Sequence, residues 1–257
     1  MNTSFRKKLL AGEPLIGTWV KTPSHIVSEV LGHSALDCIS LDAEHAPFDR
    51  GALDASIAAL RAASMASLVR IPHTAPEHVL NALDCGATGI IAPHLKSAEE
   101  ANALAQMSRY GAGGRGYAGS SRSAGYGTSG MADNLERGNK NSAVIAQIED
   151  LEALDEIDDI AKVDGIDCFF IGRIDLTVAL GATSPKDPIV VDAVKRVCTV
   201  CRDAGRAVGM FVGDLAEIPK WRQAGATLFI LKSDHSFLLD GARQLRDDFD
   251  QHVRSTS

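Results

Sequence analysis

The chain has 257 residues, of which 45% are hydrophobic and 23% are charged, and its formal net charge is -7 at pH 7. This composition is typical of a globular protein, and the length fits a single (β/α)₈ barrel domain over residues 1–257. The net negative charge and the lack of a cluster of basic residues argue against binding to nucleic acid and against binding to an anionic membrane surface.

Eight short and mostly continuous apolar runs are typical of strands that are buried on both faces of a parallel sheet. Amphipathic helical patterns separate them along the chain. The strands are expected at 15–20, 36–41, 67–71, 88–92, 143–148, 166–171, 207–212 and 226–231. Eight strands alternating with eight helices favour a closed barrel. An open doubly wound sheet is the alternative, weakened because no glycine-rich phosphate loop follows the first strand.

Several helix ends carry capping signals. Residues 74–77 (TAPE) and 97–100 (SAEE) each match a capping box. The last helix is expected to begin at Ser233 or Asp234. Its apolar residues suit packing either on its own barrel or against another subunit; they are Phe237, Leu238, Leu245 and Phe249.

One connection is much longer than the others. Residues 108–142, between the fourth and fifth strands, contain the glycine-rich and serine-rich segment GAGGRGYAGSSRSAGYGTSG. Long loops in compact domains are usually functional. We expect a mobile lid or a subunit-contact loop at least as readily as a phosphate cradle.

No apolar run approaches the roughly 20 residues that a membrane-spanning helix needs. The first residues, MNTSFRKKLLAGEP, lack the apolar core and cleavage signal of a secretory leader. The five cysteines are odd in number, and Cys198 and Cys201 lie within a helical pattern, so a disulfide framework is not expected. These features predict a cytoplasmic protein with reduced cysteines.

Polar residues gather where the predicted strands end, and in a (β/α)₈ barrel the active site lies at the carboxyl ends of the strands. Glu149 follows the fifth strand and Asp175 follows the sixth. Adjacent parallel strands lie about 5 Å apart, so these carboxylates could share a hard cation such as Mg²⁺ or Mn²⁺. The alternative is that both acids cap helices. The positions at the strand ends are Asp42, Glu44, His45, Arg70, Pro93, His94, Gln147, Glu149, Gly172, Arg173, Asp175, Val212, Gly213, Asp214, Lys232, Ser233 and Asp234.

Arg70 ends the apolar strand SLVRI and must be paired or face a polar cavity, because burying an unpaired charge is costly. A structural salt bridge to Asp42 or Glu44 is the alternative to a functional role. His45, taken alone, is more typical of an ordinary loop residue. Asp84 ends a helix, where the dipole disfavours an acid, so we expect it to have a partner, with His45 and Arg70 as candidates.

The blocks GTW, LDAEHAP, LVRIP, LDCGATGIIAP, QIED and IGRIDL occur in this order along the chain. In order and spacing they resemble the HpcH/HpaI aldolase family of metal-dependent class II pyruvate aldolases, which belongs to the phosphoenolpyruvate/pyruvate barrel superfamily. The resemblance runs from about Gly17 to about Phe249. It implies reversible cleavage of a 4-hydroxy-2-oxo acid into pyruvate or hydroxypyruvate and an aldehyde. Substrates of the 4-hydroxy-2-oxoheptanedioate or 2-keto-3-deoxy sugar acid type are implied.

The resemblance also implies roles for individual residues. Glu149 and Asp175 match the ligands of a divalent cation, which would be Mg²⁺, Mn²⁺ or Co²⁺. Gln147 matches a substrate contact. The turn of residues 172–175 resembles the one whose backbone amides hold the pyruvate carboxylate, and its substrate-binding positions here are Gly172, Ile174 and Asp175.

By the same resemblance, Arg70 matches the group that stabilises the enolate oxygen, and His45 matches the acid/base histidine. Asp84 matches the acidic partner of that histidine. The family assembles as hexamers, often with the last helix exchanged between subunits, which implies a homo-oligomer here and possible swapping of the C-terminal helix.

The chain departs from the family at two positions. Arg173 stands where proline is usual, and Ile174 replaces a small residue. Arg173 could reach a carboxylate or hydroxyl at the distal end of the aldehyde. We favour the alternative, a salt bridge to an acid such as Asp214 or exposure to solvent.

Three other functions compete with the aldolase hypothesis. One is a citrate-lyase-type enzyme that acts on a CoA thioester. Another is a Schiff-base aldolase, which needs an interior lysine. The sixth strand has none, and Lys232 lies at a strand end where a capping or surface role is equally suitable. The third is a non-catalytic barrel that binds a keto acid.

Overall fold

Eight parallel strands close into a barrel in the order in which they occur along the chain, with β8 paired to β1. The computed structural model describes residues 4–255. The strands are β1 (Leu15–Val20), β2 (Cys38–Asp42), β3 (Ala66–Arg70), β4 (Gly89–Ala92), β5 (Ala143–Ile148), β6 (Cys168–Ile171), β7 (Ala207–Phe211) and β8 (Leu228–Ser233). The predicted (β/α)₈ barrel is confirmed.

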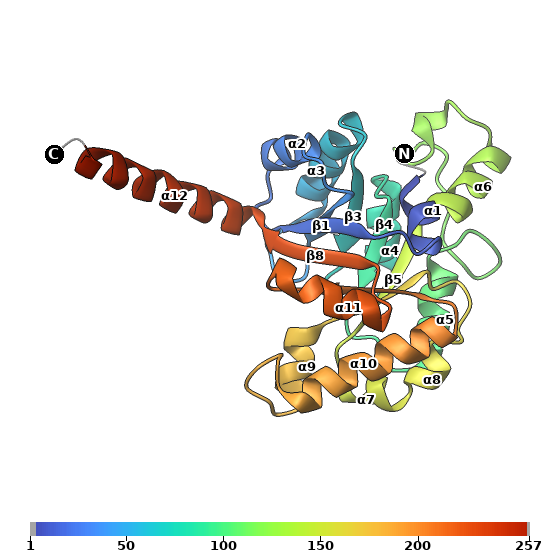
Figure 1. Ribbon diagram of the computed structural model, residues 1–257. Coiled ribbons are helices and arrows are strands. Elements are labelled where there is room, and N and C mark those ends of the chain that lie inside the picture. The colour runs from blue at the N-terminus through green and yellow to red at the C-terminus, as the bar shows by residue number, and fades with distance from the viewer. Residues whose placement is uncertain (1–3, 256–257) are drawn as a thin grey trace.

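Helices surround the barrel, and the last of them extends away from it (Figure 1). The α-helices are α1 (Ser4–Leu10), α2 (His25–Gly32), α3 (Arg50–Ala62), α4 (Pro76–Asp84), α5 (Ala98–Met107), α6 (Met131–Asn141), α7 (Leu151–Asp155), α8 (Ile157–Ile160), α9 (Arg173–Ala179), α10 (Pro188–Asp203), α11 (Ile218–Ala224) and α12 (Asp234–Ser255). Two short 3₁₀ helices, η1 (Gly125–Gly127) and η2 (Leu215–Glu217), lie in connections.

The apolar strands contribute to two cores, which explains why their sequences are continuously hydrophobic rather than alternating. One core fills the barrel and includes Ile145 and Phe170, and the other, between the strands and the helices, includes Val144 and Phe169. Phe5 and Leu9 of α1 belong to the inner core. Successive residues of a strand point to opposite faces, so each strand supplies both cores.

Charged residues shorten two of the predicted strands at their amino ends. Asp37 lies before β2, and one of its carboxylate oxygens accepts a hydrogen bond from the amide of Ile16 (3.0 Å). Asp167 lies before β6 and binds Arg6 and Arg109. The predicted runs 36–41 and 166–171 therefore begin two residues before the observed strands, because these acids bind neighbouring segments instead.

The long connection 108–142 is partly helical, since it contains η1 and α6, which the sequence did not indicate. The capping box at 97–100 is confirmed by the hydrogen bond from the Glu100 amide to Ser97 Oγ (3.2 Å). The one at 74–77 is wrong. Ala75 is the N-cap of α4, and the Thr74 hydroxyl donates to the carbonyl of Pro93 (3.3 Å).

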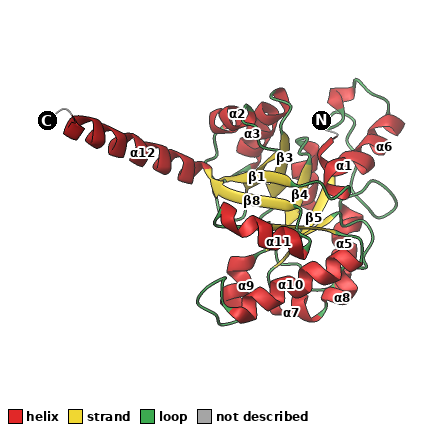
Figure 2. Cartoon of the chain, in the orientation of Figure 1, coloured by secondary structure: helices red, strands yellow, loops and turns green. Residues whose placement is uncertain are grey.

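The helix α12 protrudes from the barrel as a single long helix (Figure 2). Its exposed apolar side chains are Phe237, Leu238, Leu239, Leu245, Phe249 and Val253. None of the described helices is long and apolar enough to cross a bilayer. All five cysteines are buried and free, as the sequence predicted.

Candidate active site

A buried ion pair closes the barrel interior at the carboxyl ends of β2 and β3. Asp42 and Arg70 are the last residues of these strands and face each other in register. Arg70 Nε and Nη2 donate to the two carboxylate oxygens of Asp42 at 3.0 and 2.8 Å. The guanidinium also lies 4.4 Å from the centroid of the Trp19 ring. This two-point contact fixes the orientation of Arg70.

Asp42 organises the turn that follows β2. Its carboxylate accepts a hydrogen bond from the amide of His45 (3.1 Å) and lies 3.2 Å from Lys21 Nζ. Burial by itself would raise the pKa of Asp42, but Arg70, the His45 amide and Lys21 together hold that pKa below its ordinary value. Asp42 therefore remains a carboxylate that anchors Arg70.

Glu149 follows β5, and its side chain is buried, with 3% of the residue exposed. Its carboxylate accepts hydrogen bonds from the amide of His94 (2.9 Å) and from Gln147 Nε2. A side chain at position 172 would clash with it, because a Cβ on Gly172 would lie 2.6 Å from Glu149 Oε2. Burial raises the pKa of Glu149 despite these donors, and the negative charge of Asp175 raises it further.

His94 lies between three acids just after β4. Its Nδ1 is 3.0 Å from Asp150 Oδ2 and 3.4 Å from Glu149 Oε1, and its Nε2 is 3.4 Å from Glu44 Oε1. Burial lowers the pKa of His94, but the bond to Asp150 and the charges of the three acids raise it overall. One ligand atom each from Glu44, His94 and Glu149 lies within 4.8 Å of the other two.

Glu44 also contacts Arg70, whose Nε lies 3.2 Å from Glu44 Oε2. Burial is the largest cause of the raised pKa of Glu44, and Asp42 and Asp175 add to it. The negative charge of Asp175 therefore raises the pKa of both Glu44 and Glu149, which places the three carboxylates near one another. Such a cluster is a suitable environment for a cation.

The turn after β6 supplies backbone donors to the same rim. The amide of Gly172 is already used, since it donates to the carbonyl of Ile148 (3.0 Å). The helix α9 begins at Arg173, so the amides of Arg173, Ile174 and Asp175 belong to its first turn and have no partner within the helix. Gln147 Oε1 is buried and has no hydrogen-bond partner among the described residues.

Most of the predicted site residues come together at this rim: Arg70, Gln147, Glu149, Gly172, Ile174 and Asp175. His45 lies at its outer edge. Its side chain is 55% exposed, and its Nε2 is 3.6 Å from Glu44 Oε2.

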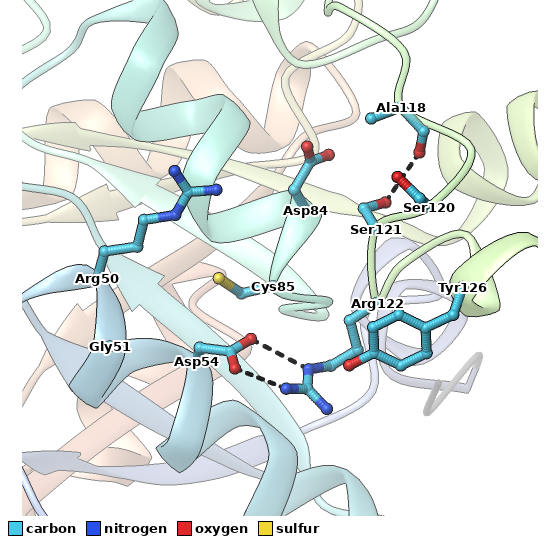
Figure 3. Close-up of a pocket in the computed structure, with 10 residues that line it drawn as sticks. All are labelled: Arg50, Gly51, Asp54, Asp84, Cys85, Ala118, Ser120, Ser121, Arg122 and Tyr126. Carbon is cyan, nitrogen blue, oxygen red and sulfur yellow. Dashed lines mark hydrogen bonds and ion pairs between the residues drawn. The ribbon is translucent and has the colours of Figure 1, made fainter.

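Asp84 is not part of this cluster. The prediction that it pairs with His45 or Arg70 is wrong for a single copy of the chain. Its carboxylate accepts a hydrogen bond from Arg115 Nη2. It lines a pocket of about 580 Å³ that also contains Asp54 and Arg122 (Figure 3). The helix α4 runs from the carboxyl end of β3 back toward the amino end of β4, and therefore carries its last residue away from the rim.

Arg173 is paired within the chain rather than free at the rim, and its Nη1 donates to the carbonyl of Phe211, the last residue of β7 (3.4 Å). The residue is buried, its Nη2 donates to Glu217 Oε2 (2.6 Å), and its guanidinium lies 4.9 Å from the centroid of the Trp221 ring. The expected salt bridge exists, but its acid is Glu217 rather than Asp214, which instead caps η2.

The sequence indicated Glu44 only as an alternative salt-bridge partner of Arg70, a contact that the structure contains, and it indicated no role for His94 or Asp150. The available signal was their position directly after buried strands. Chain order alone does not indicate that the turns after β2, β4 and β5 converge.

Comparisons with known proteins agree with this geometry. The family model described as HpcH/HpaI aldolase/citrate lyase matches residues 15–240. The chain is 34% identical to the hydroxypyruvate/pyruvate aldolase of Paraburkholderia phytofirmans over 97% of each chain. It is 32% identical to the 5-keto-4-deoxy-D-glucarate aldolase of Shigella boydii over 95% of each. A crystal structure of an HpcH/HpaI aldolase/citrate lyase family protein from Burkholderia cenocepacia superposes with a TM-score of 0.91 at 34% identity, covering 96% of this chain and 99% of that one.

Proposed function

Because the chain belongs to the HpcH/HpaI aldolase/citrate lyase family, we propose that it is a divalent-metal-dependent aldolase. It reversibly cleaves a 4-hydroxy-2-oxo acid into pyruvate or hydroxypyruvate and an aldehyde. The observation that carries this proposal is the convergence of an anchored Arg70 and the buried Glu149 at one rim of the barrel.

The residues at the rim fit a divalent cation. Glu149 and Asp175 are the proposed ligands, and the unpartnered Gln147 Oε1 offers a further oxygen to the ion or to the substrate. Burial and the negative charge of Asp175 raise the pKa of Glu149, and a cation bound beside the two carboxylates would oppose this shift. A bound Mg²⁺, Mn²⁺ or Co²⁺ would polarise the keto acid and stabilise negative charge on its oxygen.

Arg70 is suited to stabilise the enolate. Loss of the aldehyde leaves a negative charge on the C2 oxygen, and a guanidinium already fixed by Asp42 needs no reorganisation to meet that charge. The first-turn amides of α9, at Ile174 and Asp175, are suited to hold the carboxylate of the keto acid, with Gly172 leaving space beside Glu149.

His45 is suited to move the proton. In the cleavage direction His45 accepts the proton of the 4-hydroxyl group. The C3–C4 bond then breaks, and the electron pair of that bond becomes part of the enolate. The aldehyde leaves, and a proton then returns to C3 to give pyruvate. An imidazole that is accessible at the edge of the rim serves both transfers.

The alternatives find less support. Lys232 is exposed, and its Nζ lies 2.7 Å from Asp240 Oδ2, so it is not an interior lysine poised for a Schiff base. The aldolase names of the relatives favour the aldolase over a lyase that acts on CoA thioesters. The anchored Arg70 and the buried carboxylate cluster favour an enzyme over a non-catalytic keto-acid-binding barrel.

The test is an aldol screen of pyruvate and hydroxypyruvate against assorted aldehydes, with the reverse cleavage assayed on the products. We expect EDTA to abolish activity and Mg²⁺, Mn²⁺ or Co²⁺ to restore it. Full activity in excess chelator, or inactivation by borohydride that depends on substrate, would refute the metal-dependent mechanism. Malyl-CoA and citramalyl-CoA as substrates test the alternative lyase.

We further propose that the protein assembles as a hexamer with α12 exchanged between subunits. The residues Phe237, Leu245, Phe249 and Val253 follow one another at intervals of four or eight, so they share one face of α12, and all are exposed in the single chain. An exposed apolar face of this kind is normally covered by a partner. A role for Asp84 beside His45 then requires a second copy of the chain.

Light scattering on the full chain and on the double variant Leu245→Asp/Phe249→Asp tests the assembly. We expect a hexamer for the wild type and smaller species for the variant, with circular dichroism unchanged. A monomeric wild type would refute the assembly. Mixing subunits that carry His45→Ala with subunits that carry Asp84→Asn should restore some activity if the two residues meet across an interface.

A further inference from the structure

We propose that His73, Glu77 and His78 form a second cation site, separate from the one proposed for the aldolase, and that it binds Zn²⁺ or a similar borderline cation. These residues lie in the connection after β3 and in the first turn of α4. The inference goes beyond the proposed function and does not depend on it, because the site uses none of the residues assigned to the reaction.

The three side chains converge on one point. One donor atom from each lies within 4.8 Å of the other two. Ligand atoms around a tetrahedral Zn²⁺, with bond lengths of about 2.0–2.1 Å, lie roughly 3.3 Å apart, so modest side-chain rotations bring the donors to that spacing. His73 and Glu77 are exposed and His78 is only partly buried, so little packing opposes these rotations.

The backbone holds the two imidazoles together. The Thr74 hydroxyl donates to the carbonyl of Pro93 (3.3 Å), which anchors the connection, and the amide of His78 donates to the carbonyl three residues earlier (3.1 Å), which closes the first turn of the helix. The rings of His73 and His78 meet edge to face, with their centroids 4.4 Å apart. A ring pair alone would be an ordinary aromatic contact. The carboxylate of Glu77 within reach of both rings makes the group a set of metal ligands.

Glu77 supplies the negative charge that the site needs. The amino end of a helix carries a partial positive charge, which opposes a cation, and the N-cap residue of α4, Ala75, has no side-chain cap that would offset it. The two imidazoles bind a metal as neutral groups, so Glu77 is the only anion among the three ligands. Loss of this carboxylate should therefore weaken binding although both nitrogens remain.

The donor types determine which ion is preferred. Mg²⁺ prefers oxygen ligands, whereas imidazole nitrogens add affinity for Zn²⁺, Ni²⁺ and Cu²⁺. Two nitrogens and one oxygen therefore favour Zn²⁺ over Mg²⁺, and three protein ligands leave the remaining coordination position to water. Excess Mg²⁺ should accordingly leave Zn²⁺ bound at this site.

The test measures Zn²⁺ binding to the full, metal-free chain by calorimetry. Every protein carries Glu149→Gln, so that a cation at the proposed aldolase site contributes little. The test variant adds His73→Ala and His78→Ala. The matched control adds His25→Ala and His33→Ala, two other exposed histidines, which belong to neither of the two groups of clustered donor atoms in residues 4–255. Circular dichroism checks that each protein is folded.

We expect the parent and the control to bind Zn²⁺ equally, and the variant without His73 and His78 to bind it more than about 10²-fold more weakly. Loss of a group that only orients a ligand already weakens metal binding about 10–100-fold, so loss of two ligands should have a larger effect. Glu77→Gln should weaken binding about 10–100-fold. Zn²⁺ should raise the melting temperature of the parent and the control but not of the double-histidine variant.

Unchanged Zn²⁺ affinity in the double-histidine variant, an equal loss in the control, or displacement of Zn²⁺ from the parent by excess Mg²⁺ would each overturn the proposal. If the double-histidine variant does not fold, Glu77→Gln decides, and unchanged Zn²⁺ affinity in it overturns the proposal. Aldol cleavage is assayed separately on wild type with Mg²⁺. Zn²⁺ binding at this site in a protein that cleaves no keto acid would refute the proposed function alone, and cleavage by a protein without this Zn²⁺ site would refute this inference alone.

Discussion

Two buried carboxylates, Asp167 and Glu149, lie at opposite ends of the barrel on neighbouring strands. Asp167 stands directly before β6 and is 4% exposed, and Glu149 stands directly after β5 and is 3% exposed. Asp167 accepts hydrogen bonds from Arg6 Nε and Nη2 (2.9 and 2.7 Å), from Arg109 Nη2 (3.1 Å) and from the amide of Val144 (2.9 Å). Glu149 accepts from Gln147 and the His94 amide and has the acids Glu44 and Asp175 nearby.

The two sites are equally buried but differ in how their charge is compensated. Two arginines surround Asp167, which ties α1, the segment after α5 and β5 together at the amino end of the barrel. Around Glu149 the neighbours are mostly further acids, with one histidine. A buried charge that is fully paired leaves no charge to compensate, and removing one of its partners destabilises the fold, whereas a buried carboxylate beside like charges favours binding of a cation. Asp167 therefore holds neighbouring segments together, and Glu149 is the carboxylate proposed to bind a cation.

Among the variants that test the difference between Glu149 and Asp167, Glu149→Gln is expected to have the largest effect on activity. Loss of the carboxylate should lower kcat/KM for aldol cleavage about 10³-fold, because the site would lose a proposed ligand of the divalent cation that stabilises the enolate. Without metal, the variant should unfold at the same temperature as wild type or higher, since a destabilising charge is removed. Steady-state kinetics and thermal unfolding measure both. Glu152→Gln, at an exposed site nearby, is the control, and a clear drop in melting temperature for Glu149→Gln would contradict the comparison.

The opposite outcome is expected for Asp167→Asn. Arg6 and Arg109 would lose their common carboxylate, and removing one member of a buried ion pair costs about 3 kcal/mol of unfolding free energy. The rim is untouched, so kcat/KM should stay within about threefold of wild type. Urea unfolding measures the loss. Asp159→Asn, which breaks an exposed pair with Lys162, should cost less than about 1 kcal/mol. Equal costs for the two variants would show that Asp167 is not the structural anchor inferred here.

A third prediction separates the roles of Arg70 and His45 at the rim. Arg70→Ala should slow exchange of the methyl protons of pyruvate about 10²-fold, as expected for a removed oxyanion donor. Arg70→Lys should recover only part of this rate, because an ammonium cannot form the two-point contact with Asp42. His45→Ala should impair aldol cleavage more than it impairs exchange. Both rates can be followed by proton NMR, and normal exchange in Arg70→Ala would refute its assignment.

The fold was predictable because each strand is a short apolar run and the runs alternate regularly with helical patterns. The rim residues followed from the barrel rule, which places strand ends such as Arg70 and Glu149 together. The pairing of Asp84 with Arg115 was not predictable, because the long connection 108–142 has no hydrophobic pattern that shows where it folds back. The salt bridge of Arg173 was predicted, but its partner Glu217 was not, for a related reason. The position of Arg173 next to Gly172 indicates the rim, but the helical turn directs its side chain to Trp221 and Glu217.

The smallest predicted effect is a pH dependence that distinguishes Glu149 from Asp42 within the rim itself. Burial raises the pKa of Glu149 above its ordinary value of 4.5, so the folded state binds this proton more tightly than the unfolded state. Below the ordinary value the group is neutral in both states and costs nothing. As the pH rises through the folded pKa, the charge forms in the folded state and destabilises it.

For metal-free protein, the unfolding free energy of Glu149→Gln should therefore equal that of wild type in acid and exceed it by a growing margin toward neutral pH. Asp42→Asn should behave in the opposite way, because Arg70 and its neighbours lower the pKa of Asp42 below its ordinary value of 3.8 despite burial. Its stabilising contribution is complete above that value and is lost as the pH falls through the folded pKa, so this variant is weakest near neutrality. Urea unfolding in chelator at several pH values measures both margins. Addition of Co²⁺ or Mg²⁺ at neutral pH should make wild type more stable than Glu149→Gln, since only the wild type retains the carboxylate proposed to bind the ion.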